Sequence, residues 1–152
     1  MEKIRRLSKD EPIPYDLLLL ADEYIEAVKK YVFDCEIYVF EKKNEIVAQY
    51  AFQQIDNDEM EIRNIAVATE FQGRGIGRRL LRDASDRARS RGFKAIIIGT
   101  GDVSTKQLHL YQTEGFKIVS VRKNFFVENY PKPILENGKE LRDMIVLKKN
   151  LR

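Results

Sequence analysis

The stretch between residues 62 and 98 constrains the fold more than any other part of the chain. Ile62–Ala68 is predicted to form a strand, and it leads into the glycine-rich turn Gln72–Gly77. Helical spacing follows over Arg78–Arg91, and a continuous apolar strand occupies Ala95–Ile98. A strand, a helix and a second strand of these lengths predict a parallel crossover unit with a right-handed connection. The chain is therefore expected to adopt an α/β fold.

The predicted helix has one apolar face and one basic face. Its apolar stripe consists of Leu80, Leu81, Ala84 and Ala88, and much of the remaining surface consists of Arg78, Arg79, Arg82, Arg87 and Arg89. Gly92 is expected to end the helix in a left-handed conformation, which glycine adopts without a steric penalty. The apolar run Ala95–Ile98 is typical of a strand that is covered on both faces of its sheet.

The remaining patterns place more strands early in the chain and interleave helices later. Further strands are predicted at Glu2–Leu7, Cys35–Glu41, Glu45–Ile55, Met60–Ala68, Phe116–Val121 and Asp143–Leu147, with turns at Lys42–Asn44 and Asp56–Asp58. Apolar residues over Leu17–Val28 recur at helical spacing. A further helix is predicted to begin near Ser104, which has the spacing of a capping box with Gln107, and to end at Gly115. No repeat or linker interrupts the pattern, so residues 1–152 are expected to form a single domain.

The composition argues against several classes of function. The net charge of +3, from 27 basic and 24 acidic residues, is too balanced for a general nucleic-acid binder. A single cysteine, Cys35, excludes an internal disulfide and fits a reducing cytoplasm, where we expect the protein to lie. With one histidine, His109, a transition-metal site would need unusual ligands, so no metal is expected. The longest apolar run, Leu17–Ala21, is far too short to span a membrane, and no signal-type stretch follows the charged Met1–Arg6.

The glycine-rich turn has the properties of an anion site. Glycines let the backbone turn tightly and approach a ligand without Cβ clashes. The first N–H groups of the following helix lack internal partners, and the helix dipole favours a negative charge there. A pyrophosphate is the natural ligand, although a simple tight turn explains the glycines equally well. Gly77 is followed by two arginines rather than Lys and Ser or Thr, which excludes a P-loop, and Arg78 stands where the dinucleotide fingerprint requires glycine.

At these residues the sequence resembles the GCN5-related N-acetyltransferases (GNAT). Their signature, Gln/Arg-x-x-Gly-x-Gly/Ala after a strand with an apolar-x-Val pattern, is matched by Ile65–Ala66–Val67, Phe71 and Gln72–Gly77. Downstream, Leu110–Tyr111 followed by Glu114–Gly115–Phe116 is similar to the family's Leu-Tyr-x-x-x-Gly-Phe segment. The resemblance implies a three-layer fold, with a mixed central sheet and helices on both faces. It also implies direct transfer of an acetyl group from acetyl-CoA, the co-substrate, to an amine within a ternary complex.

The resemblance also implies roles for particular residues. The backbone around Ile65, Ala66 and Val67 would hold the pantetheine arm and the acetyl carbonyl. The N–H groups of Gln72, Gly73, Arg74, Gly75, Ile76, Gly77 and Arg78 would hold the pyrophosphate. The side chains of Arg74, Arg78 and Arg79 either contact phosphate as well or form a solvated basic helix face. Ser104 replaces an asparagine found in many members, and it either contacts the cofactor arm or only caps its helix.

Two residues are implied as catalytic groups. Tyr111 resembles the family's general acid near the cofactor sulfur, and its alternative role is packing of the helix against the sheet. Transfer requires a neutral amine, and for a lysine-like amine deprotonation at pH 7 costs about 4–5 kcal/mol. Glu61 matches the position where many members have a catalytic carboxylate, and Glu59 and Asp58 are nearby alternatives. A solvated carboxylate at the strand edge is the alternative for Glu61.

The acceptor is not identified by the sequence. A small-molecule amine and a peptide or protein amine both remain open, as do a larger acyl group and a non-catalytic acyl-CoA-binding module. The long segment Asn124–Leu141, rich in aromatic residues and stiffened by two prolines, is expected to shape the acceptor pocket. Glu128 or Glu136 would then attract a cationic amine. Alternatively, this segment covers the sheet edge or forms a homodimer contact.

Overall fold

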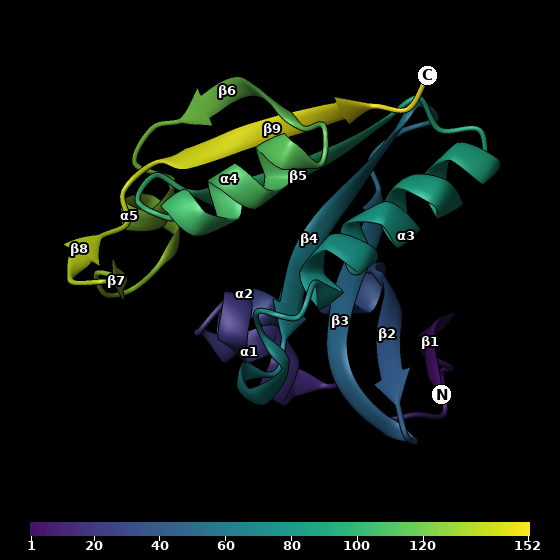
Figure 1. The fold of residues 1–152 in the computed structure, drawn as a ribbon. Coiled ribbons are helices and arrows are strands. Elements are labelled where there is room, and N and C mark those ends of the chain that lie inside the picture. The colour runs from purple at the N-terminus through teal and green to yellow at the C-terminus, as the bar shows by residue number, and fades with distance from the viewer.

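The computed structural model describes all 152 residues, and Figure 1 shows their arrangement. The strands are β1 (Glu2–Arg6), β2 (Glu36–Lys42), β3 (Glu45–Gln54), β4 (Glu59–Val67), β5 (Ala95–Gly101), β6 (Lys117–Arg122), β7 (Leu135–Glu136), β8 (Lys139–Glu140) and β9 (Met144–Asn150). The helices are α1 (Tyr15–Ala21), α2 (Ile25–Lys29), α3 (Ile76–Ser90), α4 (Thr105–Thr113) and α5 (Phe125–Asn129), with short 3₁₀ turns at Val32–Asp34 and Thr69–Phe71.

Seven strands form one mixed sheet in the order β1-β2-β3-β4-β5-β9-β6, and β7 and β8 form a separate hairpin. Every neighbouring pair in the large sheet is antiparallel except β4 and β5, which are joined by α3 and run parallel. The crossover predicted from residues 62–98 is therefore confirmed. The last strand, β9, inserts between β5 and β6, so both ends of the chain contribute to the same sheet.

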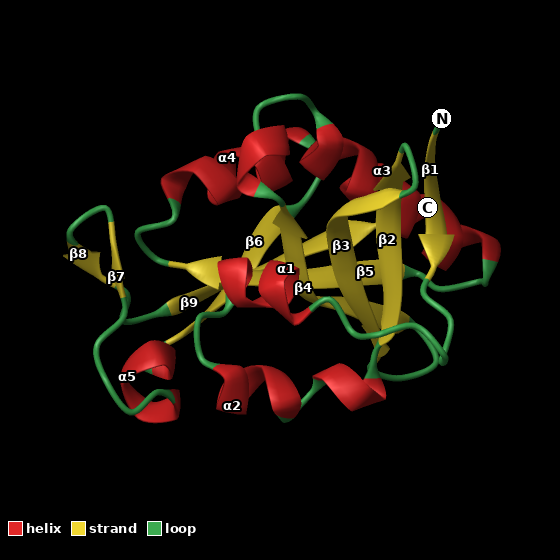
Figure 2. Cartoon of the chain, turned by 90° about the horizontal axis from the view of Figure 1, so that it is seen from below, coloured by secondary structure: helices red, strands yellow, loops and turns green.

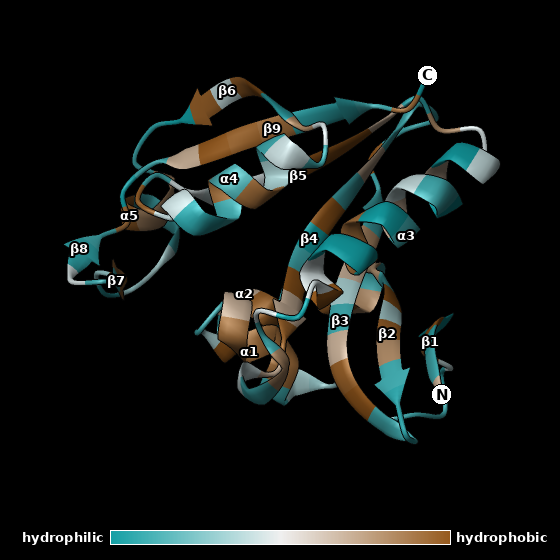
Figure 3. Cartoon of the chain, in the orientation of Figure 1, coloured by the Kyte–Doolittle hydropathy of each residue, from teal (hydrophilic) through white to brown (hydrophobic).

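Helices cover both faces of the sheet, as predicted, and each face has its own apolar cluster. Figure 2 shows α3 and α4 on one side of the strands and α2 on the other. The cluster under α3 and α4 includes Phe40, Tyr50, Phe52, Leu80, Leu81 and Ile96. The smaller cluster under α1 and α2 includes Leu18, Val28, Val32, Val39 and Ala51. In Figure 3 the apolar residues accordingly lie along the middle of the strands and on α1, while the visible face of α3 is hydrophilic.

The parallel strands β4 and β5 separate part of the way along their length. Their register runs from Glu59 and Ala95 to Ile62 and Ile98 and then stops. Beyond that point β4 pairs only with β3, and the rest of β5 pairs only with β9. The backbone edge of β4 that faces away from β3 is therefore unpaired after Ile62. In Figure 1 the two strands diverge from the end of the sheet nearest the C-terminus.

A bulge in β4 reorients the side chains at this separation. The register to β3 shifts so that Ile62 and Asn64 are opposite adjacent residues and Arg63 is extra. Ile62 and Ile65 consequently both pack against the cluster under α3. Asn64 lies on the opposite face, where its amide donates to the Leu18 carbonyl at 2.9 Å. Polar side chains of β4 are thereby directed toward the α1–α2 side of the sheet.

The structure corrects several predicted boundaries. The single helix expected over Leu17–Val28 is two short helices, separated at Asp22. The Asp22 backbone is extended there, and its side chain accepts bonds from tyrosines instead of supporting a continuous helix. The segment Asn124–Leu141 is not wholly irregular, because it contains α5 and the β7–β8 hairpin. The helix α3 begins two residues earlier than predicted, at Ile76. None of the helices is long and apolar enough to cross a membrane.

Candidate active site

The turn before α3 depends on glycine for its backbone conformation. Gly73 and Gly75 have φ angles of 78° and 82°, in the left-handed region, and Gly75 is the N-cap residue of α3. A Cβ atom at either position would meet no atom within 4 Å. The requirement at these two positions is therefore conformational and not steric. Gly77 is different, because its backbone is helical and a Cβ there would lie 3.6 Å from Leu110, in the space between α3 and α4.

This turn presents a series of free backbone donors. The first bond that closes α3 runs from the Arg79 N–H to the Gly75 carbonyl at 3.1 Å. The N–H groups before it, from Gly73 to Arg78, have neither a backbone nor a side-chain acceptor in the protein. They lie at the positive end of a 15-residue helix. Such a group of donors is the backbone arrangement that binds phosphate groups at helix N-termini.

The three arginines near the turn differ in what they contact. The guanidinium of Arg78 is 3.1 Å from Glu114, and that of Arg79 is 2.7 Å from Glu2. Arg74 has no carboxylate partner, and its guanidinium lies 5.1 Å from the centre of the Phe71 ring. Arg74 is therefore the side chain at this turn that is available to a phosphate, whereas Arg78 offers its backbone N–H.

The free edge of β4 continues directly into this turn. The Ala68 N–H donates to Val47 of β3 at 2.8 Å. Because backbone direction alternates along a strand, the groups of Ala66 also face β3, and those of Ile65 and Val67 face the gap beside β5. The Gln72 side chain donates to the Val67 carbonyl at 2.9 Å, which ties the turn to the strand.

Tyr111 lies on α4, in the apolar cluster on the α3 face of the sheet. Its ring is 5% exposed and packs against Phe116, with ring centres 6.2 Å apart. The hydroxyl makes no hydrogen bond within the protein. Burial raises the pKa of Tyr111 well above its ordinary value, and the charge of Glu136 raises it further. The phenol therefore stays protonated, as a proton donor must.

The capping box predicted at Ser104 is wrong. Ser104 occupies the N-cap position of α4, but its side chain makes no cap hydrogen bond. Its ψ of 62° departs from the extended value of a side-chain cap, and its own N–H closes a tight turn onto the Gly101 carbonyl at 3.1 Å. The residue is only 5% exposed near the end of β5, and its hydroxyl makes no hydrogen bond to the helix.

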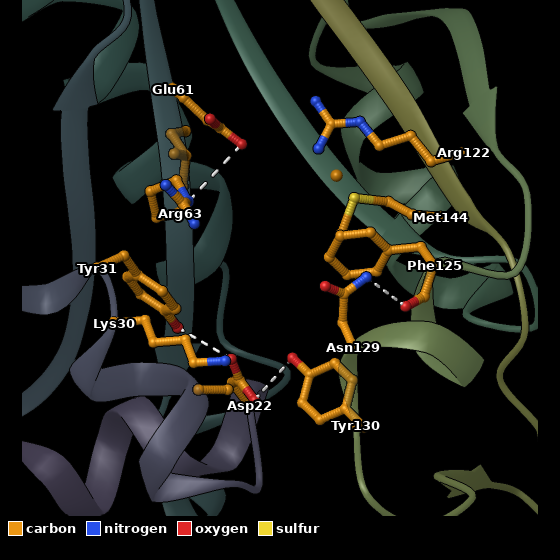
Figure 4. Close-up of a pocket in the computed structure, with 13 residues that line it drawn as sticks. Asp22, Lys30, Tyr31, Glu61, Arg63, Arg122, Phe125, Asn129, Tyr130 and Met144 are labelled. Atoms are coloured by element: carbon orange, nitrogen blue, oxygen red, sulfur yellow. Dashed lines mark hydrogen bonds and ion pairs between the residues drawn. The ribbon is translucent and has the colours of Figure 1, made fainter.

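A cavity of about 290 Å³ lies on the other face of the sheet, where β4 and β5 separate. It is lined by Asp22, Ala27, Lys30, Tyr31, Glu61, Ile62, Arg63, Gly99, Arg122, Phe125, Asn129, Tyr130 and Met144. These residues come from α1–α2, β4, β5, β6, α5 and β9, and Figure 4 shows their side chains converging on a common space. The aromatic segment after Asn124 contributes to this wall, as predicted. Glu128 and Glu136 do not line it, and basic side chains lie there instead.

Glu61 is the carboxylate of β4 that faces this cavity. Its side chain is 19% exposed, and burial raises the pKa of Glu61, an effect that Arg63 and Arg122 partly oppose. The Arg63 Nε atom is 3.9 Å from the Glu61 carboxylate. The two alternatives predicted from the sequence do not line the cavity: Glu59 is ion-paired with Lys148 at 2.6 Å, and Asp58 lies in an exposed turn.

A second acid of the cavity, Asp22, was not identified from the sequence. Its two carboxylate oxygens accept bonds from the Tyr130 hydroxyl at 3.0 Å and the Tyr31 hydroxyl at 3.2 Å. Burial raises the pKa of Asp22. Asn64 in turn donates to the Tyr31 hydroxyl at 3.1 Å. These bonds join the α1–α2 connection to β4 and to the segment after α5, and no pattern in the sequence signalled them.

The candidate acid and base thus lie on opposite faces of the sheet. Tyr111 belongs to the cluster under α3 and α4, and Glu61 faces the cavity under α1 and α2. The unpaired edge of β4 separates them, and the donors of the Gln72–Arg78 turn follow that edge. The arrangement suits a reaction in which one reactant enters along the α3 face and the other arrives from the α1–α2 face.

Comparisons with known proteins agree with this arrangement. Residues 1–116 match the Acetyltransferase (GNAT) family. The chain is 40% identical over 133 residues to the uncharacterized N-acetyltransferase YvbK of Bacillus subtilis (strain 168), a match that covers 88% of this chain and 86% of that protein.

Two solved structures are similar over almost their whole length. A GNAT family acetyltransferase from Elizabethkingia anophelis with acetyl-CoA bound has a TM-score of 0.95 and 47% identity, covering 98% of this chain and 97% of that one. A Bacillus subtilis acetyltransferase in complex with CoA has a TM-score of 0.92 and 36% identity, covering 100% of both chains. With the strand, glycine turn and helix in the expected places, these matches show that the chain belongs to the GNAT acetyltransferase family.

Proposed function

We propose that this protein transfers the acetyl group of acetyl-CoA directly to an amine, in a ternary complex. The observation that carries the proposal is the free backbone edge of β4, with the unpaired donors of residues 73–78 at its end. Tyr111 lies on one side of this edge, and Glu61 lies on the other. The solved relative from Elizabethkingia anophelis, which contains acetyl-CoA, supports this choice of acetyl donor.

The donors of the turn fit the negative end of acetyl-CoA. N–H groups from Gly73 to Arg78 hold the pyrophosphate, and Arg74 adds a charge-assisted contact. The backbone groups of Ile65 and the N–H of Val67, whose carbonyl is bonded to Gln72, orient the pantetheine arm and the acetyl carbonyl in the gap. The backbone groups of Ala66 bond to β3, and this pairing fixes the direction in which the groups of Ile65 and Val67 point. The Ser104 hydroxyl, which has no helix partner, contacts the arm near the end of β5. Bound in this way, acetyl-CoA supplies an activated thioester.

Glu61 and Tyr111 then move the protons of the reaction. Glu61 takes a proton from the attacking amine, directly or through a water molecule, and its raised pKa makes it a stronger base than an exposed carboxylate. Tyr111 donates a hydrogen bond to the departing sulfur. A thiol has a pKa near 8.5 and tyrosine ordinarily near 10, and burial raises the pKa of Tyr111 further. Full proton donation is therefore uphill, and the hydrogen bond itself supplies the help.

No covalent acetyl-enzyme is needed in this scheme. Cys35 is the single cysteine, and it lies before β2, outside the cavity. Burial raises the pKa of Cys35 to about 12. The nucleophilic form of cysteine is the thiolate, so at neutral pH this side chain is unreactive. Direct attack by the amine is therefore the simpler course.

The test is an acetylation screen of the purified protein with acetyl-CoA and a panel of polyamines, aminoglycosides, amino acids and peptides. Thiol release and mass spectrometry of the product report turnover. We expect at least one amine to gain an acetyl group at a rate that depends on Tyr111. Tight acetyl-CoA binding with no acetylated product from any amine would contradict the proposal and favour a non-catalytic acyl-CoA-binding module. Faster turnover with a longer acyl-CoA would instead change the proposed donor.

A further inference from the structure

We propose that the acceptor is an amine that also bears a carboxylate, and that Arg122, assisted by Arg63, binds this carboxylate in the cavity beside Glu61. The inference rests on the proposed function, because it names the acceptor class of the same site. It starts from the charges that line the cavity, which differ from those expected for a polycationic acceptor.

Arg122 faces the cavity, and its guanidinium has no hydrogen-bond or ion-pair partner in the protein. It is the last residue of β6, opposite Met144 of β9, and Figure 4 shows its guanidinium directed across the cavity toward Glu61 and Arg63. Most arginines of the chain have a carboxylate within 4.0 Å, whereas Arg6, Arg74, Arg122 and Arg152 have none. Arg6 and Arg152 lie near the chain ends, and Arg74 lies at the proposed pyrophosphate turn. Arg122 is thus the unpaired arginine of the acceptor cavity.

The cavity as a whole favours an anion. Three cationic side chains line it, Lys30, Arg63 and Arg122, against the two carboxylates Asp22 and Glu61. The oxygens of Asp22 accept bonds from two tyrosine hydroxyls, and no arginine or lysine forms an ion pair with this carboxylate within 4.0 Å. A cavity with excess positive charge attracts anionic ligands and repels polycations. Its volume of about 290 Å³ suits a small molecule or the end of a chain.

The two arginines are held in different ways. Arg63 is fixed: one of its nitrogens donates to Gln53 at 2.6 Å, and its guanidinium lies 4.7 Å from the centre of the Tyr31 ring. Arg122 makes no such contacts, so the parallel N–H groups of its planar guanidinium are available to the two oxygens of a carboxylate. Arg63 therefore supplies a fixed positive field, and Arg122 supplies the direct contact.

The same charges help the chemistry at Glu61. A positive charge near an ammonium group disfavours its protonated form and lowers its pKa. An acceptor whose carboxylate lies at Arg122 and that extends across the cavity has its amine near Arg63 and Glu61. The basic residues thus bind one group of the acceptor and promote deprotonation of the other.

The experiment compares matched acceptors that differ only in the carboxylate. The probes are the common amino acids and β-alanine, each beside its primary amide, with acetyl-CoA held saturating. We expect the wild-type protein to acetylate at least one acid with a kcat/KM tenfold or more above that of its amide. Arg122→Gln should lower kcat/KM for this acid at least tenfold, mainly through KM, and lower the value for its amide by a clearly smaller factor, because only the acid loses the carboxylate contact.

Two control variants separate recognition from a general effect. Arg142→Gln removes the same charge from an arginine that is ion-paired with Glu140 and does not line the cavity, and it should leave the preference intact. Arg122→Lys keeps the charge without the planar fork and should recover part of the preference. Circular dichroism and calorimetry with acetyl-CoA report whether each variant is folded and binds the donor.

Each outcome decides the matter. Equal use of acid and amide, preference for the amide, or an Arg122→Gln effect of the same size on both would overturn the inference. A primary amide resembles the N-terminal residue of a peptide, so preference for amides would point to a peptide acceptor and leave the proposed function standing. If polyamines or aminoglycosides are acetylated and no amino acid is, the inference about the acceptor fails and the proposed function stands. If no amine of any class is acetylated, the proposed function fails with it.

Discussion

The cofactor turn and the acceptor cavity are built in opposite ways. The turn over residues 72–78 is one continuous segment, and the groups that it offers are backbone N–H donors. The cavity takes its lining from α1–α2, β4, β5, β6, α5 and β9, and its functional groups are side chains. A site whose ligand groups are backbone N–H donors depends on local conformation, so a few glycines in the sequence are enough to predict its position. A site made of side chains depends on the packing of segments that are distant in sequence, so its specificity can change through single substitutions.

The largest expected effect concerns the turn. Gly75→Val should lower acetyl-CoA affinity by about 100-fold or more. Valine disfavours the left-handed φ of Gly75, so the backbone at position 75 should change and turn the N–H donors of α3 away from the ligand. The conformational penalty for such a residue is about 1–3 kcal/mol. Gly92→Val is the matched control, since Gly92 has a φ of 86° at the other end of α3 and equally open space. Calorimetry should show weakened binding in the first variant alone, and unchanged affinity in a folded Gly75→Val protein would remove the pyrophosphate assignment.

The next effect tests the face of the sheet that carries Tyr111. Tyr111→Phe should lower kcat by roughly ten- to a thousandfold and leave acetyl-CoA affinity nearly unchanged, because only the hydroxyl is lost. The ring contact with Phe116 remains, so stability should change little. Steady-state kinetics and thermal unfolding measure the two effects separately. Wild-type turnover in the variant would assign Tyr111 to packing only.

A smaller effect tests the carboxylate of the cavity. Activity should fall as the pH drops through the raised pKa of Glu61, because the base must be ionised. Glu61→Gln should lower kcat by about 10- to 100-fold and flatten this acidic limb. Glu59→Gln is the matched control, two residues earlier on β4 and paired with Lys148. An unaltered pH profile in Glu61→Gln, or a flattened one in Glu59→Gln, would move the role to another group.

Glu61→Gln also has an expected effect on stability. A buried carboxyl with a raised pKa is disfavoured when ionised, so its contribution to stability is greatest below the unfolded pKa and is lost as the pH rises through the folded pKa. The variant removes this penalty, and its melting temperature at neutral pH should be equal to or above that of the wild type. A lower melting temperature would indicate that Glu61 is held for structure.

The smallest expected effect concerns the hydrogen bond between Tyr130 and Asp22 across the cavity. Tyr130→Phe removes the bond to Asp22 at 3.0 Å and leaves the bond from Tyr31 in place. We expect the KM for the acceptor to rise about two- to fivefold and stability to fall by roughly 1 kcal/mol, the usual net value of one hydrogen bond. Tyr24→Phe is the control, because its ring packs on Tyr130 but its hydroxyl has no protein partner. Equal effects in both variants would show that the rings matter and the bond to Asp22 does not.

Sequence patterns alone predicted the crossover unit, the hairpin β2–β3 and the position of the glycine turn before α3. Asn44 has a positive φ angle in that hairpin, and Gly73 and Gly75 have positive φ angles in the turn, so at these three positions the residue type indicates the conformation. Periodicity of 3.6 residues identified the long helix α3, which buries one face, and alternating or continuous apolar runs identified the strands of the large sheet. These features are local, and their causes lie within a few residues of where they act.

The proposed acceptor cavity, in contrast, became visible only in the folded structure. The break between α1 and α2 at Asp22, the bulge at Arg63 and the cavity wall at Arg122 depend on partners far along the chain. Asp22 meets Tyr130 across 108 residues, and no pattern near either residue reports that contact. Which side chains contact each other depends on packing and desolvation, and these effects bring together residues that are distant in the sequence. Backbone conformation is chosen by steric limits within the residue and its neighbours, and for that reason the turn was predictable from the sequence and the cavity was not.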